Sequence, residues 1–339
     1  MIDTPYKGRY QTGVSFSVKE PMKTSLFPLF SESLASWVVL TMCVLSVGGC
    51  GTNSSSNNGL KLGVIYSLSG DQASLDESSL KGAELAAEYI NTHGGISGTP
   101  IALEIRDAAT SSAATLKQAK ELFEDEGVSL IVGLSDTDLA APVATLSQKL
   151  GRLFITSGAT GPVLTTLGPQ STFLACFSDD SQAMAASYFA RHRLGARSAL
   201  IAYDEGSEYA HTLSSSFSRG FISSGGSVTS LLSFTTENTN TAALINQLHQ
   251  KNPDIAVIAA QPVEAAAIIR ALRSAGFTKP IIGGDSYDSQ RIYDLLPSEK
   301  AKVYFTTHTL LSPSSQNPEI ENFINQYKSH YCLLYTSPS

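Results

Sequence analysis

Segments with the pattern of a strand alternate with segments with the pattern of a helix from residue 60 to residue 307. The strand-like segments are short apolar runs, whereas the helix-like segments are longer and repeat apolar residues at helical spacing, as Leu80, Ala83 and Ala87 do. The expected strands are 60–67, 101–106, 130–133, 153–156, 199–203, 227–234, 255–260, 281–283 and 303–307. The expected helices are 78–91, 113–126, 139–150, 182–194, 209–224, 241–250, 263–275 and 317–331. This alternation predicts an α/β fold of parallel sheets covered by helices on both faces.

The alternating segments form two series, one before and one after residues 173–177. A chain of 339 residues is long enough for two domains, each with a core of its own. We therefore predict two doubly wound parallel-sheet lobes. Because such sheets bind ligands at the carboxyl ends of their strands, two facing lobes would hold a ligand between their loops and close around it about a hinge.

Composition excludes several classes of function. The formal net charge is −7 and the Lys and Arg residues are not clustered, so a nucleic-acid partner is not expected. The four cysteines and six histidines lack the spacing of a zinc site or a disulfide framework. We therefore expect neither a metal nor another cofactor.

The N-terminal segment has the pattern of an export signal. Residues 34–47 form an apolar run that is too short for a comfortable membrane span, and Lys19 and Lys23 precede it. The small residues before Cys50 resemble a bacterial lipobox, and the polar stretch 51–59 suits a flexible tether. We predict that residues 1–50 are a lipoprotein signal peptide, with Met22 as an alternative start, and that lipidation of Cys50 anchors the protein outside the cytoplasmic membrane, in the periplasm or on the cell surface of a bacterium. A soluble secreted protein with a chance cysteine is the alternative.

A series of short motifs resembles one known family. They are KLGVIYSLSG at 61–70, KGAELA at 81–86, ITSGAT at 155–160, YD at 203–204 and GGD at 283–285. In this order and at this spacing they resemble the type I periplasmic binding proteins of the branched-chain amino acid kind, and the resemblance spans about residues 60–331. It implies a monomeric, non-catalytic binding subunit that delivers an amino acid or a related small molecule to the permease and ATPase subunits of an ABC importer.

The same resemblance implies how the lobes are composed. Residues 60–176 and the returning helix up to 331 (311–331) would form lobe 1, and residues 177–310 would form lobe 2, with a hinge of several strands between them. The last residues, 332–339, look unlike the family and like translated adaptor sequence. We therefore expect a non-native tail on a truncated reading frame.

The resemblance assigns the ligand's carboxylate to loops of the first lobe. The matching positions are Ser135, Gly158, Ala159 and Thr160. Glycine allows close approach of the backbone, and Thr160 adds a hydroxyl before a helix start at Pro162, where free N–H groups favour an anion. A turn whose hydroxyls bond its own backbone is the alternative.

The resemblance assigns the ligand's amine to the second lobe. Asp285 ends a predicted strand and would pair with the ammonium, although an aspartate that starts a turn gives the same pattern. Tyr209 would line the cleft, with packing at a helix start as the alternative. Leu75 and Gln261 stand where amino-acid-binding members often carry aromatic residues, so their contacts with a ligand, and the ligand's identity, stay open.

Two other classes of function compete with import. An enzyme on the same fold would need a catalytic motif, but the chain has no GxGxxG after its first strand, no GxxxxGK[ST] and no GxSxG. A lipid-anchored sensor that reports its ligand to a receptor would use the same two lobes. The predicted lipobox argues against a cytoplasmic regulator.

Overall fold

The structure is a computed structural model that describes residues 59–235, 241–298, 301–309, 311 and 317–332. The predicted signal peptide, the lipidation site Cys50 and nearly all of the tether lie outside the described residues, as does the tail from residue 333 onward. The predictions made for these segments stay predictions. None of the described helices combines the length and apolar character that crossing a membrane requires.

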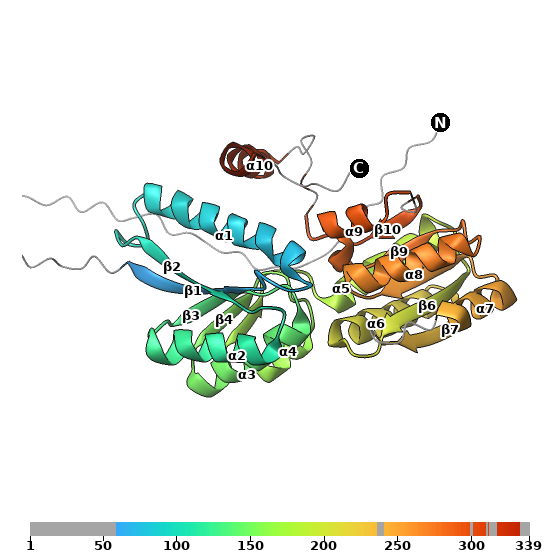
Figure 1. The fold of residues 1–339 in the computed structure, drawn as a ribbon, viewed down its shortest axis with the longest axis horizontal. Helices are drawn as coiled ribbons and strands as arrows, with labels where there is room; N and C mark the ends of the chain where they lie inside the picture. Colours follow the sequence, from blue (N-terminus) through green and yellow to red (C-terminus); the bar gives the residue numbers. More distant parts are fainter. Residues whose placement is uncertain (1–58, 236–240, 299–300, 310, 312–316, 333–339) are drawn as a thin grey trace, which may run out of the picture. The chain divides into compact units, whose positions relative to one another are not determined.

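The described strands form two five-stranded parallel sheets (Figure 1). The first sheet has the order β2-β1-β3-β4-β5, and its strands are β1 (Leu60–Tyr66), β2 (Ile101–Asp107), β3 (Leu130–Gly133), β4 (Leu153–Thr156) and β5 (Thr172–Leu174). The second sheet has the order β10-β9-β8-β6-β7, and its strands are β6 (Ser198–Asp204), β7 (Ser227–Phe234), β8 (Ile255–Ala259), β9 (Ile281–Gly283) and β10 (Val303–Phe305). The predicted fold class is confirmed.

Helices connect the strands and flank both sheets. They are α1 (Ala73–Thr92), α2 (Ser112–Lys120), α3 (Thr137–Leu150), α4 (Val163–Leu167), α5 (Asp179–His192), α6 (Glu208–Ser223), α7 (Thr241–Lys251), α8 (Pro262–Ser274), α9 (Gln290–Leu295) and α10 (Pro318–Tyr331). A π-helical turn, Glu121–Asp125, extends α2, and a 3-10 turn, Asp285–Tyr287, follows β9. In Figure 1, α1 lies on one face of the first sheet and α2 and α3 lie on the other.

Side chains cap several helices that carry site residues. The side chain of Asp136 accepts the N–H groups of Asp138 and Leu139 at the start of α3. Ser178 and Ser207 accept from the first turns of α5 and α6 in the same way. These caps satisfy N–H groups that a helix start otherwise leaves free, so they fix where each helix leaves its loop.

Helices cover both faces of the second sheet. Successive residues of its central strands point to opposite faces, so one strand contributes side chains to two cores. On β6, Leu200 and Ala202 join a core with α7, α8 and α9, whereas Ala199 and Ile201 join a second core with α5 and α6. A third core lies in the first sheet, between its strands and α2, α3 and α4. The chain therefore has separate cores for its two sheets.

Helix α10 returns to the first sheet's side of the molecule. The hydroxyl of Tyr331 donates to the carbonyl of Lys81 on α1 at 3.2 Å, and His330 lies 3.1 Å from Glu88 of the same helix. The chain itself passes from β5 into α5, whose residues belong to a core of the second sheet. The lobe boundaries predicted from the resemblance stay a prediction.

Candidate functional site

Loops at the carboxyl ends of the strands carry the predicted site residues. Ser135 follows β3, Gly158 to Thr160 follow β4, Gln261 follows β8 and Asp285 follows β9. The strand order reverses beside β1 in the first sheet and beside β6 in the second. Such reversals open crevices between neighbouring loops, and they are where open α/β sheets bind ligands.

The carbonyl of Leu134 holds the loops after β3 and β4 together. It accepts the N–H groups of Gly158 and Ala159 at 3.2 and 3.1 Å and the hydroxyl of Thr156 at 3.1 Å. Leu134 is buried and has a φ of +61°, a conformation that costs energy in a residue with a β-branch or bulky side chain. The backbone donors that the resemblance assigned to a carboxylate at Gly158 and Ala159 thus have a partner inside the protein.

Gly158 leaves room for Ser135. A Cβ on Gly158 would lie 2.9 Å from the hydroxyl oxygen of Ser135. Ser135 also lies close to Asp76, a buried carboxylate on α1 that accepts the N–H of Ser67 at 2.7 Å. Burial raises the pKa of Asp76 to about 6, and the polar groups of Ser135 and Ser67 oppose the rise. Among the described residues, the other oxygen of Asp76 and the hydroxyl of Ser67 have no hydrogen-bond partner.

Thr160 makes a buried contact with an aspartate that sequence reasoning missed. Its hydroxyl donates to Oδ1 of Asp179 at 2.7 Å, and the two residues are 1% and 0% exposed. Burial and, to a smaller extent, the charge of Asp285 raise the pKa of Asp179 to about 8. Thr160 belongs to a loop of the first sheet, whereas Asp179 is the first residue of α5. This contact therefore joins the parts of the chain that belong to the two sheets.

Asp285 lies in the 3-10 turn after β9 with one histidine beside it. Its Oδ2 is 3.0 Å from Nε2 of His308, and its side chain is 13% exposed. The backbone N–H of Phe177 donates to Nδ1 of His308 at 3.2 Å. Because Nδ1 accepts there, the neutral ring carries its proton on Nε2 and donates it to Asp285.

Tyr209 is buried beneath the same turn. Its hydroxyl donates to Ser286 at 3.2 Å, and Ser286 donates to the carbonyl of Ala260 at 2.8 Å. A Cβ on Gly284 would lie 2.1 Å from the Tyr209 hydroxyl oxygen, so this close approach needs glycine. Burial, together with the charges of Asp285 and Asp179, holds the pKa of Tyr209 well above its ordinary value. The tyrosine therefore lies near both aspartates, with its hydroxyl bonded within the protein.

Two hydrogen bonds link loops of the two sheets directly. Oδ2 of Asp136, after β3, accepts from Gln261 Nε2 at 2.9 Å and from Gln72 Nε2 at 2.8 Å. The carboxylate of Asp138 accepts the N–H of Glu208, the first residue of α6, at 3.2 Å. Burial and the charge of Asp136 together raise the pKa of Asp138 to about 6. Gln261 thus lies at a contact between the two sets of loops, whereas Leu75 is half-buried in the first turn of α1.

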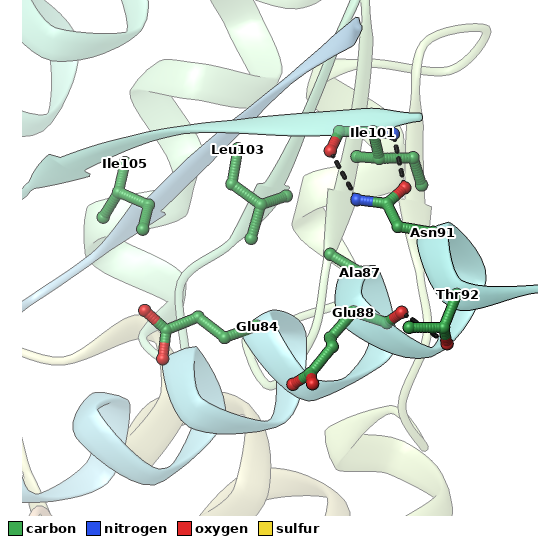
Figure 2. A pocket seen from close by; sticks show the side chains of 8 residues that line it. All are labelled: Glu84, Ala87, Glu88, Asn91, Thr92, Ile101, Leu103 and Ile105. Atoms are coloured by element: carbon green, nitrogen blue, oxygen red, sulfur yellow. Dashed lines mark hydrogen bonds between the residues drawn. The ribbon is translucent and has the colours of Figure 1, made fainter. Parts of the chain in front are cut away.

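A separate groove of about 610 Å³ lies between α1 and β2 (Figure 2). Its apolar wall is formed by β2, and its polar wall by α1. The side chain of Asn91 bridges the two walls through both backbone groups of Ile101, at 2.9 and 2.6 Å. None of the predicted site residues lines this groove, so it is a different feature from the site at the strand ends.

Known proteins share both the sequence pattern and the fold. A family model described as periplasmic binding protein matches residues 59–333. The Leu/Ile/Val-binding protein homolog 3 of Brucella melitensis is 26% identical over 270 residues, which cover 80% of this chain and 72% of the relative.

Two solved structures superpose on most of the chain. The substrate-binding protein LivJ of Streptococcus pneumoniae, solved in complex with isoleucine, has a TM-score of 0.73 at 25% identity and covers 81% of this chain and 78% of its own. The leucine-binding protein LivK of Thermotoga maritima has a TM-score of 0.75 at 25% identity, with 81% of this chain and 77% of its own covered. The chain therefore belongs to the periplasmic binding protein family, whose members bind solutes for transporters rather than catalyse reactions.

Proposed function

We propose that this protein is the lipid-anchored, extracytoplasmic binding subunit of an ABC importer. It captures an α-amino acid between the loops of its two sheets and hands it to a permease unchanged. The hydroxyl of Ser135 and the backbone N–H of Thr160 serve the ligand's carboxylate end, Gly158 and Ala159 shape that loop, and Asp285 pairs with the ammonium. Tyr209, Leu75 and Gln261 form the surrounding walls.

The observation that carries the proposal is the pair of hydrogen bonds that join opposite loops. Asp136 accepts from Gln261 at 2.9 Å, and Asp138 accepts the N–H of Glu208 at 3.2 Å. They support a closed arrangement in which polar groups of the first sheet face Asp285 of the second. The related LivJ and LivK proteins, whose names give branched-chain amino acid and leucine binding, support the ligand class.

Solute binding is tested by thermal unfolding of the purified protein with the twenty amino acids, their amides and aromatic acids. A solute that binds the folded state adds about 2.7 kcal/mol to the free energy of unfolding at a hundredfold excess over its Kd. We expect one group of amino acids to raise the unfolding temperature and to be recovered unaltered. Chemical conversion of the solute would contradict the proposal, and so would the absence of any stabilising amino acid.

Anchoring and import need a test in cells. Replacing Cys50 by serine should release the protein from the membrane fraction, and deleting the gene should reduce uptake of the radiolabelled amino acid that binds in vitro. Unchanged uptake after deletion, with binding intact, would favour a sensor that reports the same ligand.

A further inference from the structure

Asp76 is a buried carboxylate in the first turn of α1, and one of its two oxygens lacks a partner in the described part of the chain. The residue is 1% exposed, and Oδ2 accepts the N–H of Ser67 at 2.7 Å. Neither Oδ1 of Asp76 nor the hydroxyl of Ser67 has a hydrogen-bond partner among the described residues. Buried polar atoms in folded proteins are nearly always bonded, and an ionised carboxylate is costly to bury without a partner. Because Oδ2 already accepts a hydrogen bond, a proton bound by Asp76 would lie on Oδ1.

The start of α1 meets the loops after β1 and β3 at this carboxylate. Ser67 and Ser135 lie at matching places in these two loops, each two residues beyond the last pair that β1 and β3 form. At the N-terminus of α1, Nε2 of Gln72 donates to Asp136 at 2.8 Å and so ties the helix to the loop after β3. Ser135 therefore lies close to Asp76, and its polar group opposes the rise in the pKa of that carboxyl.

Ser135 is more exposed than the aspartate beside it. It is half-buried, whereas Asp76 is buried. A solute between the loops can therefore reach the serine but not the aspartate. Any effect of Asp76 on the ligand's carboxylate passes through the hydroxyl of Ser135.

The charge of Asp76 decides what Ser135 offers to a carboxylate. A serine hydroxyl has one hydrogen to donate and two lone pairs that accept. When Asp76 is ionised, Oδ1 accepts this hydrogen, and Ser135 turns only lone pairs toward the carboxylate. When Oδ1 carries a proton, it donates to the Ser135 oxygen, and the hydroxyl hydrogen is left for the carboxylate. The ionised aspartate also disfavours a second negative charge nearby.

We propose that Asp76 is a positioning residue for the ligand's carboxylate, which turns the Ser135 hydroxyl toward the carboxylate when it carries a proton and away from it when it is ionised. This inference rests on the proposed function, in which that hydroxyl binds the carboxylate, and names a further residue for it. The protonated form of Asp76 is then the form that binds an amino acid tightly.

The two forms of Asp76 interchange near pH 6, because burial raises the pKa of this carboxyl to about 6. If only the protonated form binds tightly, the Kd grows by up to about tenfold for each pH unit above 6. The titratable groups that face Asp76 are Asp136, whose charge adds to the rise, and Tyr66 at the end of β1. Burial, and then the charge of Asp76, hold the pKa of Tyr66 above its ordinary value, so the tyrosine stays neutral. Comparing two proteins that differ only at Asp76 cancels the contributions of the other groups.

The experiment compares Asp76→Asn with Glu77→Gln, the next residue of α1, whose side chain is 66% exposed and pairs with Lys81 at 2.8 Å. The asparagine oxygen accepts the N–H of Ser67, and its NH2 group donates to Ser135 at every pH, so the variant reproduces the protonated aspartate. Calorimetry measures the affinity for leucine, isoleucine and the best-bound of the other amino acids between pH 5 and pH 8.

Asp76→Asn should bind amino acids more tightly than wild type at pH 8. The ratio of the wild-type Kd to that of Asp76→Asn should rise by about tenfold or more from pH 5 to pH 8. Glu77→Gln should stay within about threefold of wild type throughout. Ser135→Ala should weaken binding by about tenfold or more at pH 5, and adding Asp76→Asn to it should no longer improve binding at pH 8. The ligand-free unfolding temperature of Asp76→Asn at pH 8 should be unchanged or higher.

The outcomes distinguish this inference from the proposed function. A Kd ratio that stays constant from pH 5 to pH 8 overturns the role of Asp76 while solute binding stands. An equal gain from Asp76→Asn with and without the Ser135 hydroxyl does so too, because the aspartate would then act by its charge alone. A wild-type protein that binds no amino acid at any of these pH values contradicts the proposed function itself.

Discussion

The hydroxyl of Thr160 donates a 2.7 Å hydrogen bond to Asp179, and both side chains are buried. The threonine lies in the loop after β4 of the first sheet, and the aspartate is the first residue of α5, which packs in a core of the second sheet. This hydrogen bond thus links the two halves of the molecule at the carboxyl ends of the strands, as the hydrogen bonds to Asp136 and Asp138 also do. The contribution of this hydrogen bond to stability can be measured, because valine has nearly the shape of threonine and asparagine has nearly the shape of aspartate.

Thr160→Val should lower the free energy of unfolding by about 1–3 kcal/mol, because it leaves Oδ1 of the buried Asp179 without its donor. The measurement is urea unfolding at pH 7. Thr145→Val is the matched control, since Thr145 is exposed on α3 and its hydroxyl bonds only the carbonyl of Ala141. A Thr160→Val protein as stable as wild type would show that the bond contributes little.

Asp179 should make stability depend on pH between about 4 and 8. Its pKa is raised by burial to about 8 from an ordinary value of 3.8, so the folded state holds a proton that the unfolded state has lost. The contribution is complete below about pH 4 and is lost as the pH rises through 8. Asp76 and Asp138, with pKa values near 6, give a similar loss at lower pH. The wild-type free energy of unfolding, minus that of Asp179→Asn, should fall from pH 6 to pH 8, and a flat difference would contradict this.

Amino acid binding should release a proton from Asp179 near neutral pH. An ammonium group paired with Asp285 offsets the negative charge that raises the pKa of Asp179, so the proton held in the free protein leaves. The groups acting on this carboxylate are Thr160, Asp285, Asp180 and Glu208, with His308 bonded to Asp285. Calorimetry at pH 7 in buffers of different ionisation enthalpy should show that wild type releases close to one proton more than Asp179→Asn. Equal release by both proteins would assign the proton to another group.

Asp285→Ala should weaken an amino acid ligand by tens-fold or more, because the ammonium loses a buried charged partner. His308→Phe should weaken ligand binding less, since it removes the hydrogen-bond donor to Oδ2 of Asp285 but leaves the negative charge of Asp285. Affinities from calorimetry give the comparison, and Asp288→Ala provides an aspartate control three residues away, beyond the 3-10 turn. An unchanged affinity in Asp285→Ala would remove this residue from the site.

Gly158→Ala should destabilise the protein by about 1–3 kcal/mol, because the added Cβ would lie 2.9 Å from the Ser135 hydroxyl and must displace it. Gly82→Ala is the control. Gly82 lies inside α1, and a Cβ added there would meet no other atom within 4 Å, so alanine should add up to about 1 kcal/mol of stability. Thermal unfolding of both variants should show a lower unfolding temperature for Gly158→Ala and an unchanged or higher one for Gly82→Ala. A neutral Gly158→Ala would mean that the loop adjusts easily.

The strands were the most predictable part of the fold, because buried strands are short apolar runs with clear ends. The bounds of β3, β4, β7 and β9 match the predicted segments. The helix starts were less predictable: α1 begins at Ala73 and α5 at Asp179, whereas the sequence suggested residues 78 and 182. The first turn of α5 is polar and falls outside the apolar repeat, and a serine cap fixes its start. At the start of α1 no side chain caps the helix, so no capping residue marks that position in the sequence. The short helix α9 had too few residues for a periodic signal.

The candidate site could be predicted only as far as its loops. The resemblance pointed to the segments after β3, β4 and β9, and the structure has polar, partly buried side chains there. Asp179 escaped notice because Ser178, Asp179 and Asp180 look like an ordinary capped helix start. Its importance depends on a contact with Thr160, nineteen residues away in sequence, that no local pattern encodes. The same holds for the hydrogen bond from Gln261 to Asp136, which joins residues 125 apart.

The carbonyl of Leu134 accepts hydrogen bonds from Thr156, at the end of β4, and from Gly158 and Ala159 in the loop that follows, so the segments after β3 and β4 are held together as one rigid unit. Loops that are already rigid in the free protein lose little conformational entropy when a solute binds. Most of the entropy lost on binding is therefore that of the loops of the second sheet. Attempts to retarget the protein to a new solute should therefore keep Leu134 and its donors intact and concentrate random libraries on Leu75 and the residues around Gln261.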